Sequence, residues 1–114
     1  MKKACLIILM VTLGIVAYCQ TTYLRHYDIQ KKHPQVEGTI SDDSTRIGNW
    51  KWWYASGKLY KTGTYNEQGQ KIGVWKVLYE DGSKCAEECH SGDGYNRSWY
   101  ENGNLKSEVE IVDG

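Results

Sequence analysis

From Val36 onward, apolar and polar residues alternate in short runs, and glycine-containing dipeptides separate several of these runs. Alternation with a period of two is typical of a β-strand with one buried face, and Asn-Gly or Asp-Gly between two such runs indicates a hairpin. Three hairpin turns are predicted, at Ser56-Gly57, Asp81-Gly82 and Asn102-Gly103. We therefore predict seven strands, at roughly residues 36–41, 49–55, 58–65, 73–80, 83–90, 95–101 and 104–112.

The predicted strands repeat one phrase. Ile47-Gly48-Asn49-Trp50 returns 25 residues later as Ile72-Gly73-Val74-Trp75, and Gly38-Thr39-Ile40 returns at the same offset as Gly63-Thr64-Tyr65. A third copy follows at a shorter spacing, with Gly94 lying 21 residues after Gly73. Periods of 20–50 residues indicate an array of small supersecondary units. The predicted fold is all-β, an antiparallel meander of stacked β-hairpin repeats that forms an elongated single sheet.

Two-residue turns would fix which residues lie opposite one another and so divide them between two faces. In the first predicted hairpin the pairs are Tyr54 with Leu59, Trp52 with Lys61, and Trp50 with Gly63. This face is predicted to be the core, with the ring of Trp50 covering the bare backbone of Gly63.

The other face is predicted to carry charged pairs at its margin, Lys76 opposite Glu87 and Arg97 opposite Glu108. Its centre is apolar and contains the candidate partner-binding residues Trp53, Tyr60, Leu78 and Trp99. In this register Trp53 pairs with Tyr60. Either residues 23–35 cover this stripe, or it is exposed for a partner.

The N-terminus has the layout of a signal peptide, with Lys2 and Lys3 before an apolar run from Ala4 to Ala17. That run is shorter than the roughly 20 residues that a membrane-spanning helix needs. We expect cleavage after Cys19. Lipidation of Cys19 and an uncleaved membrane anchor are the rival hypotheses, but a lipobox needs a small residue where Tyr18 stands.

The expected organisation is thus a signal peptide at residues 1–19, an N-terminal connector at 20–35 and a repeat domain at 36–114. The protein is expected to be exported to the periplasm, the cell envelope or the exterior, and to meet the membrane only through its signal peptide. The chain has no formal net charge at pH 7, and removing two lysines leaves it slightly acidic. No nucleic-acid-binding surface is therefore expected.

The cysteines of the predicted repeat domain, Cys85 and Cys89, lie four residues apart. On one strand this spacing is about 13 Å, beyond the roughly 7 Å that a disulfide allows. His90 follows Cys89, but a strand directs these side chains apart and no second ligand cluster is present to complete a metal site. Two half-buried thiols are expected, with no metal and no cofactor.

The sequence gives no sign of an active site. The glycines occur at turn spacing rather than in a phosphate-binding loop, and no nucleophile motif is present. Glu87 and Glu88 are adjacent on one predicted strand, so they point to opposite faces and cannot flank one bond. We predict that the protein is not an enzyme.

The segments "RIGNWKWWYASGKLYKTGTYNEQGQKIGVWKVLYEDGS" and "SWYENGNLKSEVEI" resemble MORN-repeat variants, whose pattern is G-x-W-x-x-Y-Y-x-N-G-x-L followed by a second strand with a Tyr and a Gly-rich turn. The resemblance runs from about Val36 to the C-terminus. It departs from the pattern at Asn96, which replaces a Trp, and at Lys84, which replaces a Leu. The resemblance implies a single sheet of stacked hairpins.

The resemblance also implies a function. Many bacterial members of the family are described as antitoxins, but an exported chain would not meet a cytoplasmic toxin. The expected function is therefore a non-catalytic, antitoxin-like exported module that binds another protein or an envelope component. The alternative is a cell-wall-, carbohydrate- or choline-binding module, because "KWWYASGKLYKTG" is also similar to the hairpin repeats that cage a cation or stack on sugar rings. The 25-residue offset favours the MORN variant over those modules.

Overall fold

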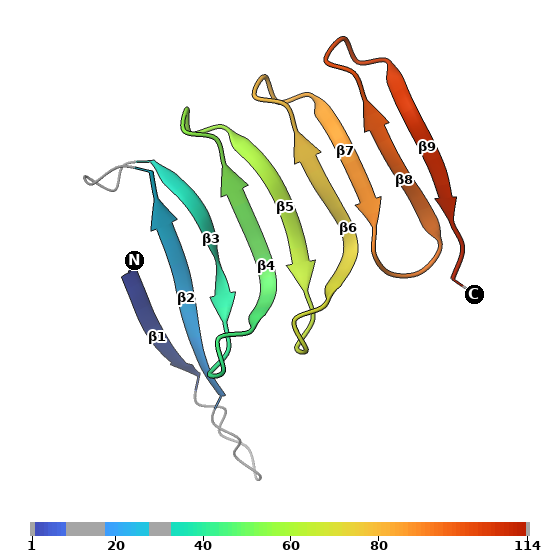
Figure 1. Cartoon of the computed structure of the whole chain (residues 1–114). Coiled ribbons are helices and arrows are strands. Elements are labelled where there is room, and N and C mark those ends of the chain that lie inside the picture. The colour runs from blue at the N-terminus through green and yellow to red at the C-terminus, as the bar shows by residue number, and fades with distance from the viewer. Residues whose placement is uncertain (1, 9–17, 28–32, 114) are drawn as a thin grey trace.

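The computed structural model describes residues 2–8, 18–27 and 33–113. Within them, one antiparallel sheet runs in chain order from one edge to the other (Figure 1). The molecule measures 52 × 46 × 20 Å, and the short dimension is that of a single layer. Its strands are β1 Lys2–Ile8, β2 Tyr18–His26, β3 Pro34–Ile40, β4 Arg46–Trp53, β5 Leu59–Tyr65, β6 Lys71–Leu78, β7 Lys84–Cys89, β8 Gly94–Trp99 and β9 Leu105–Ile111.

The predicted fold class is confirmed. Strands β3 to β9 correspond to the seven predicted strands, and each boundary lies within three residues of its prediction. No helix in the described residues is long and apolar enough to cross a membrane.

The hairpin turns differ from the prediction. The Gly57 N–H donates to the Tyr54 carbonyl at 2.9 Å, the Tyr54 N–H donates to the Lys58 carbonyl at 2.8 Å, and Gly57 has a φ of 88°. Among these loop residues only the glycine has a positive φ, so the connection is a three-residue loop ending in a left-handed residue and not a type I′ turn. Gly82 and Gly103 occupy the same position in the next two hairpins, each with a φ of 89°.

The longer loop changes the register at the end of each hairpin. The predicted pairs Trp50 with Gly63 and Trp52 with Lys61 are confirmed, but the next pair is Trp53 with Leu59. Tyr60 is left over as a β-bulge, and the predicted pair of Tyr54 with Leu59 is wrong. The same shift occurs after Val77 in the second hairpin and after Ser98 in the third. Each bulge rotates one residue out of the pattern that strict alternation predicts.

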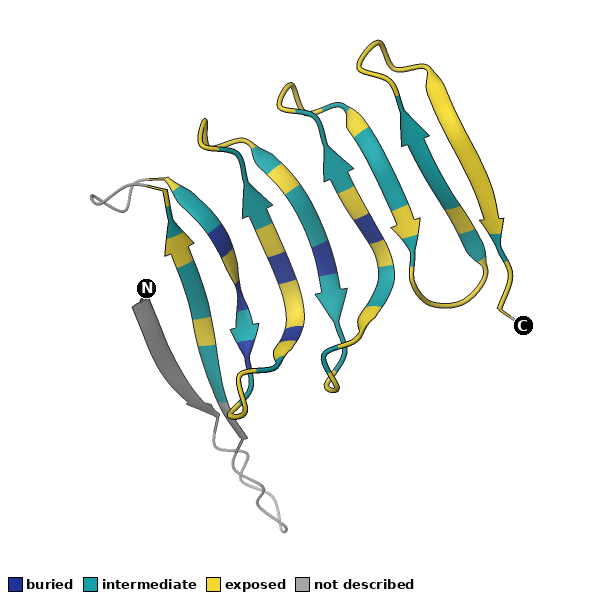
Figure 2. Cartoon of the chain, viewed as in Figure 1, coloured by how far each residue is buried: buried dark blue, intermediate teal, exposed yellow. Residues whose placement is uncertain are grey.

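The core lies on the tryptophan face of the sheet, which we define by Trp50, Trp52 and Trp75. Trp50 is 1% exposed and Trp75 is 2% exposed, although no second layer formed by the described residues covers them (Figure 2). Their neighbours provide the cover: the ring centroid of Tyr23 lies 5.6 Å from that of Trp50, and the centroid of Tyr65 lies 4.9 Å from that of Trp75. Val36, Ile40 and Ile47 complete the buried set.

Each buried tryptophan covers a glycine on the preceding strand. A Cβ added to Gly38 would lie 2.0 Å from Trp50, and one added to Gly63 would lie 2.0 Å from Trp75. The prediction that Trp50 covers Gly63 is therefore wrong in its partner, although the two residues do pair across strands. Each of the two buried tryptophans therefore packs over the strand before its own, which belongs to the preceding hairpin.

Residues 20–35, predicted to be a connector, contain most of β2 and the start of β3. Tyr23 and Tyr27 have the same four-residue spacing as Trp50 and Tyr54, so β2 and β3 form a divergent first repeat. Tyr23 stacks on Trp50 as the tryptophans of the later repeats stack on their neighbours. Residues 28–32, in the connection between β2 and β3, lie outside the described residues.

The signal peptide predicted at residues 1–19 falls partly outside the described residues, at 1 and 9–17. Its described part pairs Lys2–Ile8 with β2 at the edge of the sheet. Cleavage after Cys19, lipidation of Cys19 and export stay predictions.

Candidate interaction surface

An apolar stripe crosses the hairpins on the face opposite the tryptophans, near the three-residue turns. It is built from cross-strand pairs that repeat in each hairpin: Trp53 with Leu59, Leu78 with Lys84, and Trp99 with Leu105. The bulge that precedes each pair brings Leu59, Lys84 and Leu105 opposite these residues. Most members are half-buried, so each keeps part of its surface open to solvent.

Three of the four predicted partner-binding residues, Trp53, Leu78 and Trp99, thus occupy equivalent positions on one face. The fourth, Tyr60, does not belong with them. It is the bulge residue of β5, and its ring centroid lies 5.0 Å from that of Tyr54. The predicted pair of Trp53 with Tyr60 is therefore wrong, and Leu59 takes that place.

The bulge positions form a second repeated set beside the turn tyrosines. Tyr60 lies beside Tyr54, Lys106 has its Nζ 5.7 Å from the ring centroid of Tyr100, and Cys85 is the corresponding residue of β7. The signal that would have placed Tyr60 correctly is the three-residue loop, because it leaves one residue unpaired on the second strand of the hairpin.

One of the two alternatives for the stripe is that segment 23–35 covers it, but the described part of this segment lies in the sheet itself. Residues 23–26 belong to β2, and residues 34 and 35 belong to β3. Tyr27 follows β2 and donates its hydroxyl to the Trp53 carbonyl at 2.7 Å. The described residues of this segment therefore lie within the sheet, between β1 and β4.

Charged residues continue the stripe toward the centre of the same face. The Lys84 Nζ lies 5.3 Å from the ring centroid of Trp99 and 3.3 Å from a carboxylate oxygen of Glu87. Glu87 is also opposite Lys76 and Arg97, and the Arg97 Nε donates to Glu108 at 2.7 Å. The predicted charge pairs are confirmed in register, but they lie at the middle of the strands, whereas the apolar residues predicted for the centre of this face lie at the strand ends near the turns.

On the tryptophan face, lysine and arginine side chains of the chain itself lie over the aromatic rings in cation–π contacts. The Lys61 Nζ lies 4.4 Å from the ring centroid of Trp52, and the Lys71 Nζ lies 4.7 Å from that of Trp75. Burial lowers the pKa of Lys61, and the neighbouring Lys71 lowers it further. Arg46 takes the equivalent place over Trp50, with its Cζ 4.9 Å from the ring centroid.

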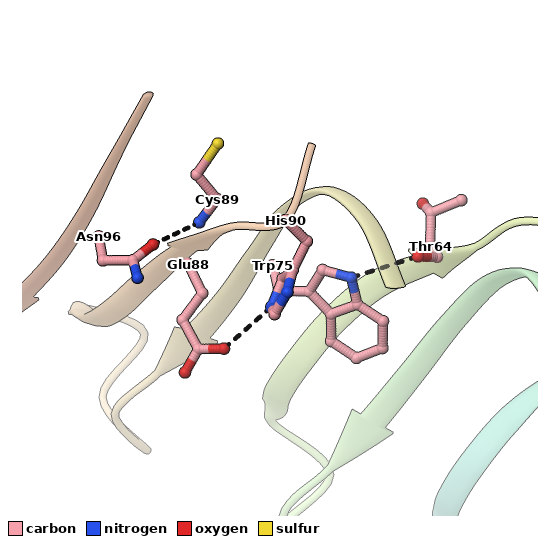
Figure 3. A network of polar contacts seen from close by, with 6 residues as sticks. All are labelled: Thr64, Trp75, Glu88, Cys89, His90 and Asn96. Carbon is pink, nitrogen blue, oxygen red and sulfur yellow. Dashed lines mark hydrogen bonds and ion pairs between the residues drawn. The ribbon is translucent and has the colours of Figure 1, made fainter. Parts of the chain in front are cut away.

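A polar network borders the core where the tryptophan series ends (Figure 3). The Trp75 Nε1 donates to the Thr64 carbonyl at 3.2 Å, and the His90 ring packs edge-on against Trp75 with a centroid distance of 6.0 Å. The His90 Nε2 lies 3.1 Å from a carboxylate oxygen of Glu88. Asn96, which stands where the earlier repeats have a tryptophan, accepts a hydrogen bond from the Cys89 N–H at 2.7 Å.

This network has too few ligands for a metal site. No group of three or more histidine, cysteine, aspartate or glutamate side chains in the described residues could hold a metal ion. Cys85 and Cys89 are both free and half-buried. His26 ends β2, and His33 lies just before β3, so the described histidines are spread over the sheet.

Tyrosines tie each hairpin to the next through a repeated hydrogen bond, which we call the tyrosine ladder. The hydroxyls of Tyr27, Tyr54 and Tyr79 donate to the carbonyls of Trp53, Leu78 and Trp99 at 2.7, 2.8 and 2.7 Å. Burial raises the pKa of Tyr54 above its ordinary value of 10.0, so the phenol remains a donor. The carbonyls belong to the stripe residues, so the ladder fixes the backbone that carries the stripe.

Comparison with known families agrees with this geometry. Residues 46–67 and 93–113 match the family model described as MORN repeat variant. These segments contain the hairpins β4–β5 and β8–β9. Two segments of the chain thus match the repeat of this family, and the resemblance seen in the sequence is confirmed. No curated protein and no solved structure matches the chain.

The hairpin β6–β7 lies between the matched segments and has the same construction. Gly73 has a φ of 69°, close to the 68° of Gly48, and Trp75 covers a glycine as Trp50 does. The family supports a repeat module of a general binding kind.

Proposed function

We propose that the chain is an exported, non-catalytic repeat module that binds a partner protein through the apolar stripe. The observation that carries the proposal is the alignment of Trp53, Leu78 and Trp99 at equivalent positions of three hairpins on one face. Partly exposed aromatic and aliphatic side chains with a charged margin are typical of a protein-binding surface. A single-layer sheet offers such a face without further rearrangement.

The export part of the proposal rests on the lysines and the apolar run at the N-terminus. It is tested by N-terminal sequencing of the product from the native host. The expected sequence starts at Gln20 in the envelope or extracellular fraction. An intact Met1 in the cytoplasm would contradict export and would favour an antitoxin role.

The choline- or sugar-binding alternative is less well supported by the tryptophan face. A cage for a ligand cation needs open aromatic rings, but Lys61 and Lys71 already lie over Trp52 and Trp75. A choline headgroup would have to displace a cation of the chain itself. On the opposite face, Lys84 lies over Trp99 in the same way.

The stripe is tested by the double variant Trp53→Ala with Trp99→Ala. Because these side chains are only half-buried, we expect far-UV circular dichroism to be unchanged and the melting temperature to change little. We expect the loss of binding to a partner isolated with the wild-type chain by cross-linking in the envelope fraction. The matched control is Val74→Ala, which removes a 50%-exposed apolar side chain outside the stripe.

The results separate binding from folding. If the double variant melts far below the control, the two tryptophans are structural and the stripe is not the binding surface. If it melts normally and still binds its partner, the stripe is also ruled out. The material bound by the wild-type chain is then treated with glycosidase. A bound species that remains after this treatment identifies a protein partner, and a bound species that is lost identifies a glycan.

A further inference from the structure

We propose that the outer edge of β9 receives one extended strand of a partner protein, which joins the sheet antiparallel to β9 and accepts a hydrogen bond from Tyr100. The tyrosine ladder motivates this proposal. Tyr100 stands four residues after Asn96, as Tyr54 stands after Trp50 and Tyr79 after Trp75. Its predecessors each donate to a carbonyl of the next hairpin, and the described chain has no strand beyond β9.

The edge itself is open and partly apolar. Every residue of β9 except Ile111 is exposed, and Figure 2 shows β9 exposed along nearly its whole length, unlike β2 to β8. Tyr100 is 51% exposed, Leu105 is 51% exposed and Val109 is 57% exposed. An edge strand carries a row of unpaired backbone N–H and C=O groups, which an added strand can pair.

The chemistry of the added strand follows from the likeness of β9 to β7. Glu108 stands 21 residues after Glu87, at the repeat offset that also relates Gly94 to Gly73. The strand beside β7 is β8, which places Arg97 opposite Glu87. An added strand in the same register would place a basic residue opposite Glu108, where opposite charges stabilise the pair.

The position next to Glu108 sets a second requirement. Val109 stands where Gly38 and Gly63 stand in the earlier repeats, and those glycines leave no room for a Cβ beneath a tryptophan. A strand with tryptophan at this position would clash with the Val109 side chain. The added strand therefore resembles β8, which has Asn96 there, rather than β4 or β6.

A second copy of the chain pairing through its own β9 fits this edge less well. When two copies of β9 pair antiparallel in one continuous sheet, the side chains that point to one face of the sheet in the first copy point to the same face in the second. Glu108 and Glu110 of both copies would then gather on one face, and like charges across strands are destabilising. The favoured occupant is a different protein that presents a β8-like strand.

The test uses the full chain and a fluorescently labelled synthetic peptide with the sequence of residues 93–101, which contains β8. We expect saturable binding by fluorescence anisotropy, with amide chemical-shift changes in the full chain confined to β9 and its turn. A peptide with glutamate in place of its arginine should bind at least about fivefold more weakly, because like charges would meet at Glu108. No binding of the parent peptide, or shifts centred on other strands, would overturn the proposal.

The Tyr100→Phe variant gives a second readout, which separates an effect on peptide binding from an effect on folding. Because the Tyr100 hydroxyl has no acceptor in the described chain, its removal should leave the melting temperature unchanged but weaken peptide binding by about fivefold. Tyr79→Phe is the matched control, since it removes an internal ladder bond and should leave peptide binding unchanged. Equal affinity of Tyr100→Phe and wild type would contradict the role given to this hydroxyl.

The edge does not depend on the stripe. Trp53→Ala should bind the peptide as the wild type does, because Trp53 lies on β4, far along the sheet from β9. Failure of the stripe in partner binding and failure of the β9 edge in peptide binding can thus be told apart. Weaker peptide binding by Trp53→Ala would place the peptide on the stripe and overturn the proposal.

Discussion

The indole ring of Trp75 lies against the backbone of Gly63 so closely that a Cβ on Gly63 would lie 2.0 Å from the ring carbon Cδ2. Trp50 and Gly38 repeat this relationship 25 residues earlier, at the same distance. A ring that covers bare backbone shields strand hydrogen bonds and buries apolar area without a second layer. This pairing explains how a single sheet holds two almost fully buried tryptophans.

Gly63→Ala should therefore destabilise the protein through a clash. Overpacking of a filled core costs about 1–3 kcal/mol, and this contact is at the upper end because the neighbour is a rigid ring. Urea denaturation at equilibrium measures the change. Gly73→Ala is the comparison, since its Cβ would meet open space and only the positive φ of 69° opposes it, at about 1–2 kcal/mol. A smaller loss for Gly63→Ala than for Gly73→Ala would contradict the packing described here.

Trp75→Ala should cost about 3–5 kcal/mol, because it removes a ring that is 2% exposed and leaves a cavity over Gly63. Neighbouring repeats stabilise one another, so much of the sheet should melt with this hairpin. Thermal unfolding followed by circular dichroism measures the effect. A shift of only one or two degrees would mean that Trp75 does not hold the core.

Much of the fold was predictable because alternation and turn glycines act locally. Trp50, Trp52 and Trp75 were assigned to the core face by parity alone, and the structure confirms this assignment. The position of Tyr60 was not predictable from parity, because the bulge that moves it depends on the loop type. Asn-Gly and Asp-Gly suit both the two-residue and the three-residue loop, so the dipeptide alone does not decide between them.

The first repeat was missed for a different reason. The sequence between its two strands, Asp28-Ile29-Gln30-Lys31-Lys32, contains no glycine and no Asn-Gly pair, and Tyr23 replaces the tryptophan. The remaining signal was the four-residue spacing of Tyr23 and Tyr27, together with the need of Trp50 for a neighbour on its far side. Only the three-dimensional stacking of Tyr23 on Trp50 makes that signal clear.

The tyrosine ladder should contribute to the stability of the array. Tyr54→Phe removes only the hydroxyl that donates to the Leu78 carbonyl, and we expect the melting temperature to fall by roughly 2–6 °C. Tyr79→Phe should act in the same direction. Tyr95→Phe is the control, because Tyr95 is 42% exposed and lies outside the ladder. Equal melting temperatures for Tyr54→Phe and Tyr95→Phe would show that the ladder bonds do not stabilise the array.

Acid should weaken the second hairpin turn. Hydrogen bonds from the Ser83 hydroxyl and the Ser83 N–H lower the pKa of Asp81 below its ordinary value of 3.8. The folded state thus binds fewer protons than the unfolded state, so this contribution is present above pH 3.8 and is lost as the pH falls through the lowered pKa. Asp81→Asn should flatten the fall in melting temperature between about pH 5 and pH 2. Asp42→Asn controls for the loss of one carboxylate, and an equal flattening by Asp42→Asn would contradict the role of Ser83.

The end of the tryptophan series gives the most specific prediction. The third repeat changes both members of the ring-over-glycine pair, with Glu88 at the glycine position and Asn96 at the tryptophan position. The register that pairs Glu87 with Arg97 places Glu88 across from Asn96. Asn96→Trp alone should destabilise the protein, because the new ring meets the Glu88 side chain and the hydrogen bond from the Cys89 N–H is lost.

Glu88→Gly alone should also destabilise, by about 0.5–1 kcal/mol for a glycine within a strand and by the loss of the contact with His90. Combined, the two substitutions rebuild the relationship seen between Trp75 and Gly63. We therefore expect a favourable coupling of about 1–3 kcal/mol in a double-mutant cycle measured by urea denaturation. Strict additivity within about 0.5 kcal/mol would show that the third repeat does not share the geometry of the first two, because the new ring would then not reach the strand before it.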